Sequence, residues 1–144
     1  MIHELYLALG SNLGDKAENI RKALDRIDER IGSVYRVANI IETAPVGYTS
    51  DNMYLNTVCL VHTMHSPERV LEETQRIERE MGRSEKTTIA SDGTPIYQDR
   101  IIDIDLLQYD QIELSTPELT LPHPRMDERP FIKQQISEIS QDIH

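Results

Sequence analysis

The chain of 144 residues has few aromatic side chains, a single cysteine and an excess of acidic over basic residues. One Phe and no Trp leave little material for the aromatic platforms on which single-stranded nucleic acids stack. The formal net charge of −10 also disfavours a nucleic-acid surface, because such surfaces are basic. We therefore expect no nucleic-acid partner.

The sequence also lacks the marks of a secreted or membrane protein. Cys59 has no second cysteine with which to pair, which excludes an internal disulfide and suits a reducing compartment. No apolar run approaches the roughly 20 residues that span a bilayer, and no basic region precedes an apolar run at the N-terminus. We expect a single domain over residues 1–144, located in the cytoplasm, with no membrane partner.

Hydrophobic periodicity predicts a mixed fold. The apolar positions of residues 15–31 recur at helical spacing, while residues 54–62 alternate as a strand does. The same criteria give the order strand, helix, strand, strand, helix, strand, at residues 4–9, 15–31, 34–42, 54–62, 67–81 and 100–107. This βαββαβ order is typical of the ferredoxin-like α+β sandwich, in which helices pack on one face of an antiparallel sheet. The opposite face would then be left for ligands.

The remaining segments are less regular. A polar loop at residues 84–99 is long for a compact domain, which indicates a lid or a binding loop. We expect a hairpin around residues 109–111 that returns through residues 112–114. Two prolines keep residues 119–124 extended, and a last helix is expected to begin near residues 129–130.

The strand at residues 100–107 carries the most informative pattern. Side chains alternate along a strand, so Asp103 and Asp105 share one face, about 6.5–7 Å apart along the backbone. The other face carries three apolar side chains: Ile102, Ile104 and Leu106. Two carboxylates at this separation can bind one or two hard cations, and Arg100 adds a charge suited to phosphate. The alternative interpretation is a half-buried strand with two solvated acids.

Two further patterns allow a ligand-binding and a purely structural interpretation. Tyr54 and Asn56 lie on one face of a strand, where a ring and a carboxamide can recognise a flat polar heterocycle or form a surface pair. Residues 10–14 join a strand to a helix, as phosphate-binding loops do. They lack the Walker and dinucleotide-binding motifs, which favours a tight turn.

Seven short motifs occur in a fixed order along the chain: residues 9–14 (LGSNLG), 43–47 (TAPVG), 54–56 (YLN), 75–78 (QRIE), 82–83 (GR), 100–106 (RIIDIDL) and 121–124 (LPHP), with Arg129 and Phe131 beyond. In this order the chain resembles 6-hydroxymethyl-7,8-dihydropterin pyrophosphokinase, an enzyme of folate biosynthesis. The resemblance covers nearly the whole chain. It implies transfer of pyrophosphate from ATP to the hydroxymethyl group of the pterin, with release of AMP.

The resemblance also implies roles for individual residues. Two Mg²⁺ ions are expected at Asp103 and Asp105, and assistance to the transfer is expected from Arg83 and Arg100. The implied contacts to ATP are Gln75, Glu78, Arg100, Leu106, Thr120, His123 and Arg129. The implied contacts to the pterin are Thr43, Pro45, Val46, Tyr54, Asn56 and Phe131.

The chain departs from the family pattern at several positions. Ala44 stands where the family often has a proline, and Pro124 stands where an aromatic residue commonly follows the histidine. The loop after Arg83 lacks the tryptophan often found there, so Tyr97 is a candidate to take its place over the nucleotide. Lys86 is a candidate for a loop cation that is otherwise missing. A metabolite-binding module that regulates a partner is the main alternative class, but it leaves the paired carboxylates without a task.

Overall fold

The computed structural model describes residues 1–44, 53–82, 87–89, 95–97, 101–124, 126 and 129–140. Its main sheet has the order β2-β4-β1-β7, with β3 also paired to β4, and the pairs are antiparallel. The strands are β1 (His3–Ser11), β2 (Gly32–Val37), β3 (Ile41–Thr43), β4 (Tyr54–Thr63) and β7 (Asp103–Tyr109). With β2 and β3 counted as one interrupted strand, this order is that of the ferredoxin-like fold. The predicted α+β sandwich is confirmed.

The helices whose bounds the structure describes are α1 (Lys16–Arg30), α2 (Pro67–Glu80) and α4 (Pro130–Ser140). Both long helices begin at side-chain caps, because Asp15 accepts from the Glu18 N–H and Ser66 accepts from the Arg69 N–H, each at 3.2 Å. Gly82, with φ of 104°, follows the end of α2 in a conformation that glycine adopts readily. The described helices include none long and apolar enough to cross a membrane.

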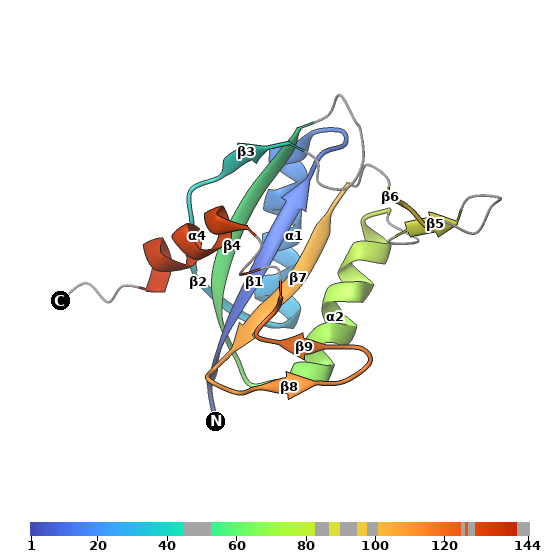
Figure 1. The fold of residues 1–144 in the computed structure, drawn as a ribbon. Coiled ribbons are helices and arrows are strands. Elements are labelled where there is room, and N and C mark those ends of the chain that lie inside the picture. Colours follow the sequence, from blue (N-terminus) through green and yellow to red (C-terminus); the bar gives the residue numbers. More distant parts are fainter. Residues whose placement is uncertain are drawn as a thin grey trace.

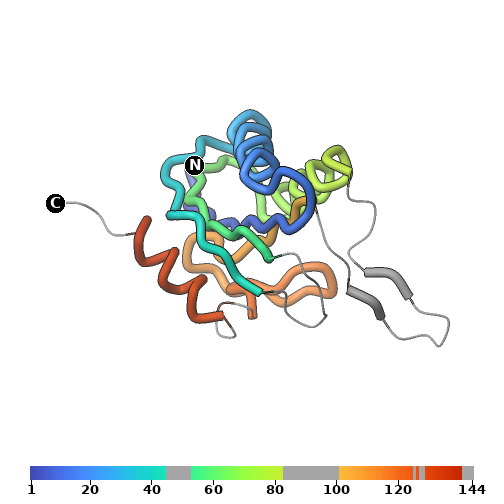
Figure 2. Tube along the Cα trace, turned by 90° about the horizontal axis from the view of Figure 1, so that it is seen from above, coloured from blue at the N-terminus to red at the C-terminus, as the bar shows by residue number. Residues whose placement is uncertain are grey.

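The helices lie on both faces of the sheet. Figures 1 and 2 show α1 and α2 on one face and α4 on the other. The larger apolar core lies between the sheet, α1 and α2, and includes Leu5, Leu7, Leu9, Ile27 and Ile77. A second core lies under α4: Tyr6, Ala38, Val58, Leu60, Leu107, Ile132 and Ile139. The face expected to be left for ligands is therefore partly covered by α4.

The predicted strand at residues 34–42 is interrupted. Ala38 still donates its N–H to the Val58 carbonyl, but its own carbonyl accepts from the Thr57 hydroxyl at 2.7 Å. The next carbonyl, that of Asn39, accepts from the Gln135 side chain. Because these two carbonyls accept hydrogen bonds from side chains and not from the backbone of β4, regular strand pairing stops at Val37 and resumes in β3.

Two other expectations about connections are corrected. The segment after β7 does not return along that strand, because β8 (Leu114–Ser115) pairs with β9 (Thr120–Leu121). The turn itself is held by Asp110, whose N–H donates to the Glu4 carbonyl at 2.7 Å. Within the loop predicted at residues 84–99, β5 (Thr87–Ile89) and β6 (Pro95–Tyr97) pair as two short strands.

Candidate active site

Asp103 and Asp105 lie on β7 with their side chains on the face that also carries α4. Ile104 and Leu106, which alternate with them, are buried in the core beneath α1 and α2, as predicted. Opposite the two acids on β1 stand Gly10 and Ala8, which have small side chains or none. Both carboxylates are half-buried, so space for a ligand remains in front of the sheet.

The outer edge of β7 is held by a buried carboxylate. Glu78 of α2 is only 4% exposed, and its Oε2 accepts a hydrogen bond from the Ile104 N–H at 2.8 Å. Backbone groups alternate in direction along a strand, so Leu106 turns its N–H and C=O to the same outer edge. One residue on, the Leu107 carbonyl accepts from the His123 N–H at 2.8 Å. The backbone of the strand with the two acids is therefore held by Glu78 at Ile104 and by His123 at Leu107.

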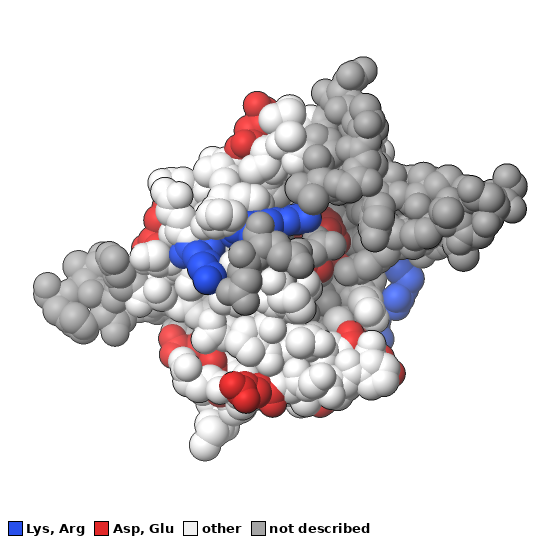
Figure 3. All heavy atoms as spheres, in the orientation of Figure 1, with Lys and Arg blue, Asp and Glu red and all other residues white. Residues whose placement is uncertain are grey.

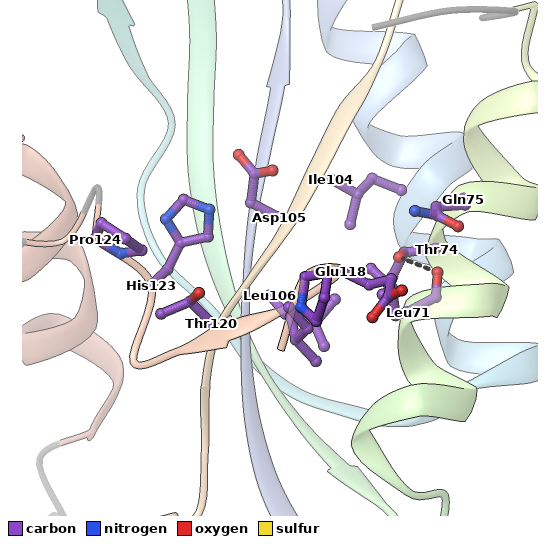
Figure 4. Close-up of a pocket in the computed structure, with 12 residues that line it drawn as sticks. Leu71, Thr74, Gln75, Ile104, Asp105, Leu106, Glu118, Thr120, His123 and Pro124 are labelled. Atoms are coloured by element: carbon purple, nitrogen blue, oxygen red, sulfur yellow. Dashed lines mark hydrogen bonds between the residues drawn. The ribbon is translucent and has the colours of Figure 1, made fainter. Parts of the chain in front are cut away.

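A pocket of about 400 Å³ lies along this outer edge. Its walls come from α2, from β7 and from the segment after β8: Leu71, Thr74, Gln75, Ile104, Asp105, Leu106, Pro117, Glu118, Leu119, Thr120, His123 and Pro124. Figure 4 shows Asp105, His123 and Thr120 toward one end, and Gln75, Thr74 and Leu71 toward the other. An anionic group held through a cation at the Asp105 end would leave the end near Leu71 for a flat ring.

A second group of predicted residues lies on the α4 side of the sheet. The Asn56 Nδ2 donates to the Thr43 Oγ1 at 2.6 Å, and Thr43 is opposite Tyr54 in the β3–β4 ladder. A Cβ placed on Gly10 would be 3.1 Å from the Asn56 Oδ1 and 3.4 Å from the Tyr54 ring. Gly10 thus forms the floor beneath both side chains.

Residue Gly10 also joins the two groups. It is opposite Asn56 on β4 and opposite Asp103 on β7, so the three residues form one row across the sheet. Neighbouring strands are about 4.8 Å apart, which places the Asn56 and Asp103 backbones roughly 9.5 Å from each other. The middle of this row carries no side chain, so a small ring system can lie against the backbone there.

The N-terminal end of α4 supplies two further predicted residues. Phe131 is partly buried against the core under α4. The Arg129 carbonyl accepts from the Ile132 N–H at 3.0 Å, which fixes Arg129 at the entry to the helix. In Figure 3 a short band of Lys and Arg atoms crosses the middle of this face, with acidic atoms at one end. Positive and negative groups therefore lie close together on this face of the molecule.

Most of the predicted site residues fall into these two groups. Gln75, Leu106, Thr120 and His123 line the pocket together with Asp105, whereas Glu78 contacts the β7 backbone and is absent from the pocket wall. Five predicted residues lie outside the described residues: Pro45, Val46, Arg83, Lys86 and Arg100. Sequence reasoning missed the pocket residues Leu71, Thr74 and Glu118. The i, i+3, i+4 spacing of Leu71, Thr74 and Gln75 could have revealed the first two.

The single cysteine has no place in this site. Cys59 is fully buried in the core between the sheet, α1 and α2. Burial raises the pKa of its thiol to about 12, although a backbone hydrogen bond from Leu7 lowers that pKa in part. A thiol with so high a pKa is not a nucleophile at neutral pH, so the chemistry of the site depends on the carboxylates and cations.

A ferredoxin-like sheet with a nucleotide-sized pocket beside two strand carboxylates is typical of an enzyme that handles a metal–nucleotide complex. Comparison with known proteins defines the family. The model of the 7,8-dihydro-6-hydroxymethylpterin-pyrophosphokinase (HPPK) family matches residues 6–141, and the chain belongs to this family.

Curated relatives agree with this assignment. The chain is 38% identical over 141 residues to the 2-amino-4-hydroxy-6-hydroxymethyldihydropteridine pyrophosphokinase of Porphyromonas gingivalis, covering 97% of this chain and 92% of that protein. It is 35% identical over 139 residues to the Bacillus subtilis protein of the same name, covering 96% and 78%. A solved HPPK-DHPS structure in complex with substrates superposes with a TM-score of 0.66 at 14% identity. That match covers 96% of this chain and 40% of the solved chain, and it shows the fold alone.

The predicted function is thereby confirmed. The chain is an ATP-dependent pyrophosphokinase, a transferase of folate synthesis that transfers pyrophosphate from ATP to hydroxymethyldihydropterin. Its substrates are small molecules. Mg²⁺ is generally expected for an enzyme that uses ATP in this way.

Proposed function

We propose that residues 1–144 act as one pyrophosphokinase domain in which the outer edge of β7 binds ATP and the α4 side of the sheet binds the pterin. The observation that supports this arrangement is the row of Asn56, Gly10 and Asp103 across three adjacent strands. The acids stand between the two subsites, because Asp105 also lines the pocket. The reacting hydroxyl and the β-phosphorus would meet beside Asp103 and Asp105.

In the ATP subsite, the adenine would lie at the apolar end of the pocket, against Leu71, Leu106 and Leu119. The backbone N–H and C=O of Leu106 supply one donor and one acceptor at the outer edge of β7, and the Gln75 amide can supply both. Thr120 and His123 lie nearer Asp105, where the ribose and phosphates would pass. Arg129 and, from the resemblance, Glu78, Arg83 and Arg100 complete this subsite.

In the pterin subsite, Asn56 would pair with the polar edge of the heterocycle, since a carboxamide offers both a donor and an acceptor. The 2.6 Å hydrogen bond from its Nδ2 to Thr43 fixes the orientation of that carboxamide. Phe131 and Tyr54 would lie against the faces of the ring, and Gly10 allows the ring to approach the sheet closely. The resemblance adds Pro45 and Val46 to this subsite.

The two acids fit the cation that the family requires. Mg²⁺ is usually held by one or two carboxylates together with substrate phosphates, and seldom by a cage of protein ligands. The described residues contain no group of three or more His, Cys, Asp or Glu side chains that could hold a metal ion. Two Mg²⁺ ions held by Asp103 and Asp105 would neutralise phosphate charge and lower the pKa of the attacking hydroxyl.

The residues of the chain then have three tasks in the transfer. The two subsites hold the hydroxyl and the β-phosphorus in line, which is most of what phosphoryl-type transfer requires. Arg83 and Arg100 would offset the charge that develops on the transferred group and on AMP. The walls around the row of Asn56, Gly10 and Asp103 would exclude water, so that pyrophosphate passes to the pterin and not to water.

The direct test is release of AMP from ATP in the presence of Mg²⁺ and hydroxymethyldihydropterin. Asp103→Asn and Asp105→Asn keep the shape of each side chain, and each should lower the rate at least about 100-fold, since several kcal/mol of charge stabilisation are lost. Asp25→Asn, an exposed substitution on α1, is the matched control and should leave the rate unchanged. Turnover near the wild-type rate in either site variant would refute the placement of the acids.

The number of metal ions needs its own measurement. Titration of Mn²⁺ into the protein with a non-hydrolysable ATP analogue, followed by water-proton relaxation, should give two bound ions per chain. Asp105→Asn should reduce that number. A stoichiometry of one in the wild-type protein would contradict the two-ion proposal while leaving the ATP and pterin subsites in place.

A further inference from the structure

Gln135 is a buried polar residue in the middle of α4. It is 1% exposed, yet it lies among the apolar residues Ile132, Ile136 and Ile139 of the same helix. Its Nε2 donates two hydrogen bonds, to the Asn39 carbonyl and to the Asn56 carbonyl, each at 3.1 Å. An amide nitrogen carries two hydrogens, so both donors of Gln135 are used to bind backbone from two other segments.

The acceptor of the same amide is not used. The Gln135 Oε1 is buried and has no hydrogen-bond partner among the described residues. A buried acceptor without a partner destabilises a fold, and the two hydrogen bonds donated by the same amide offset this cost. Those donors reach the segments on which the pterin residues stand.

The three segments joined by Gln135 carry all four pterin residues that the structure describes. Asn56 is bound directly through its carbonyl, two residues from Tyr54 on β4. Asn39 precedes β3, which ends at Thr43, the hydrogen-bond partner of the Asn56 side chain. The fourth pterin residue, Phe131, is on α4 itself. It is four residues before Gln135, and residues four apart share one face of a helix.

We propose that Gln135 is a positioning residue for the pterin substrate: its amide fixes the distance between Phe131 on α4 and the Asn56–Thr43 pair on β4 and β3. This inference rests on the proposed function, because the pterin contacts are themselves proposed. Gln135 acts through these residues and touches no reacting atom. The space between Phe131 and the Asn56–Thr43 pair, here called the pterin slot, then has a width that depends on the Gln135 side chain.

Other contacts keep α4 on the sheet without Gln135. Ile132 and Ile139 are buried in the core under the helix, and the Arg36 guanidinium donates to the Ile139 carbonyl at 3.2 Å. The Arg36 and Ile139 contacts hold the C-terminal half of α4 near β2, and Ile132 packs its N-terminal half on the core. Gln135 adds hydrogen bonds from the middle of the helix to the backbones of Asn39 and Asn56. Loss of the amide should therefore loosen the pterin slot while the helix stays bound. The ATP pocket is walled by α2, β7 and residues 117–124, and it should not respond.

The test is Gln135→Met, which keeps an unbranched side chain of similar length and removes both donors. Calorimetry with a non-hydrolysable ATP analogue, and then with hydroxymethyldihydropterin added to that complex, gives the two dissociation constants separately. The pterin constant should rise about tenfold or more, as for a misplaced binding group, and the ATP-analogue constant should change less than about twofold. Gln134→Met is the matched control, because Gln134 is the exposed neighbour on the same helix, and it should change neither constant.

Direct-contact variants separate failure of this inference from failure of the proposed function. Asn56→Ala and Phe131→Ala should each weaken pterin binding. If they do and Gln135→Met does not, the inference about Gln135 is wrong and the subsite stands. If the direct-contact variants bind the pterin normally, the proposed subsite is wrong and the inference falls with it. Equal loss of both substrates in Gln135→Met would also overturn the inference, because it would indicate general loosening.

A measurement on the wild-type protein covers the case in which Gln135→Met does not fold. The two side-chain amide hydrogens of Gln135 should exchange slowly with solvent, since both are buried and hydrogen-bonded. Their nitrogen-15 NMR signals should shift when the pterin is added to the complex with the ATP analogue. Signals that exchange rapidly, or that stay unshifted while pterin binding is complete, would overturn the inference.

Discussion

Removal of the Glu78 carboxylate should both destabilise the protein and disturb its acidic strand. The Glu78 Oε2 accepts from the Ile104 N–H at 2.8 Å, and Ile104 lies between the two acids on β7. In Glu78→Ala this buried N–H loses its acceptor and the edge of β7 loses its tie to α2. In Glu78→Gln the amide oxygen can still accept the hydrogen bond, without the charge.

The magnitude follows from the contact and the burial. A hydrogen bond to a charged group contributes about 1.5–3 kcal/mol, and the methylene groups of a side chain that is 4% exposed add roughly 0.8 kcal/mol each. Relief of the buried charge offsets part of this sum, so Glu78→Ala should lower the free energy of unfolding by about 2–4 kcal/mol. For a domain of this size that is roughly 5–15 °C in Tm. Glu78→Gln should cost about 1 kcal/mol.

Urea denaturation measures the expected loss of stability, and the AMP-release rate measures the expected disturbance of the acidic strand. Stability should fall in the order wild type, Gln variant, Ala variant, and kcat should fall in the same order because Asp103 and Asp105 are less well fixed. Glu72→Ala is the control on the same helix, since that side chain is 63% exposed. An Ala variant that unfolds at the wild-type urea concentration would refute the account of Glu78 as the anchor of β7.

Three further predictions concern single residues. Gly10→Val should weaken pterin binding about tenfold or more with little loss of stability, because its side chain would meet the Asn56 Oδ1; calorimetry decides, and unchanged affinity would contradict the proposed floor. Gly32→Ala should destabilise by about 2–4 kcal/mol in urea denaturation, because a Cβ there would be 2.2 Å from a β4 carbonyl; a smaller loss would mean that the strands can separate there. Burial raises the pKa of Asp110, but the Glu4 N–H and the ring of His3 lower it more, so its folded pKa lies below its unfolded pKa. The stability that Asp110 contributes is thus present above about pH 4 and lost as the pH falls through the folded pKa. Asp110→Asn should lower Tm by a few degrees at pH 7 and by nothing in strong acid; a difference that persists in acid would exclude this linkage.

Local patterns in the sequence predicted what depends on one strand or one helix. The alternation of Asp103 and Asp105 with apolar residues fixed their face, because the period of a strand needs no tertiary information. The same rule correctly placed Asn56 and Tyr54 on the face of β4 opposite to Cys59 and Val61, which pack in the core with α1 and α2. Membership of the family added the identity of the substrates, which no periodicity contains.

Contacts between distant segments could not be predicted in this way. Nothing in the pattern of residues 130–140 tells which face of the sheet the helix covers, and the position of Gln135 among isoleucines reads as a break in the apolar stripe. The interruption between β2 and β3 depends on Thr57 and Gln135, which lie 19 and 96 residues from their partners. Glu118 entered the pocket only because β8 and β9 pair with each other.

The two halves of the site share a principle of construction that explains why their perturbations should separate. Glu78 binds the backbone of β7, and Gln135 binds the backbone of β4. Each is a buried polar side chain on a helix that hydrogen-bonds to the backbone of a strand and so fixes the position of that strand. The two helices lie on opposite faces of the sheet. A site fixed by such ties loses less conformational freedom when substrate binds, which raises affinity. Since the ties share no residue, loosening one should cost the affinity for one substrate, whereas a site formed by mobile segments alone would lose both together.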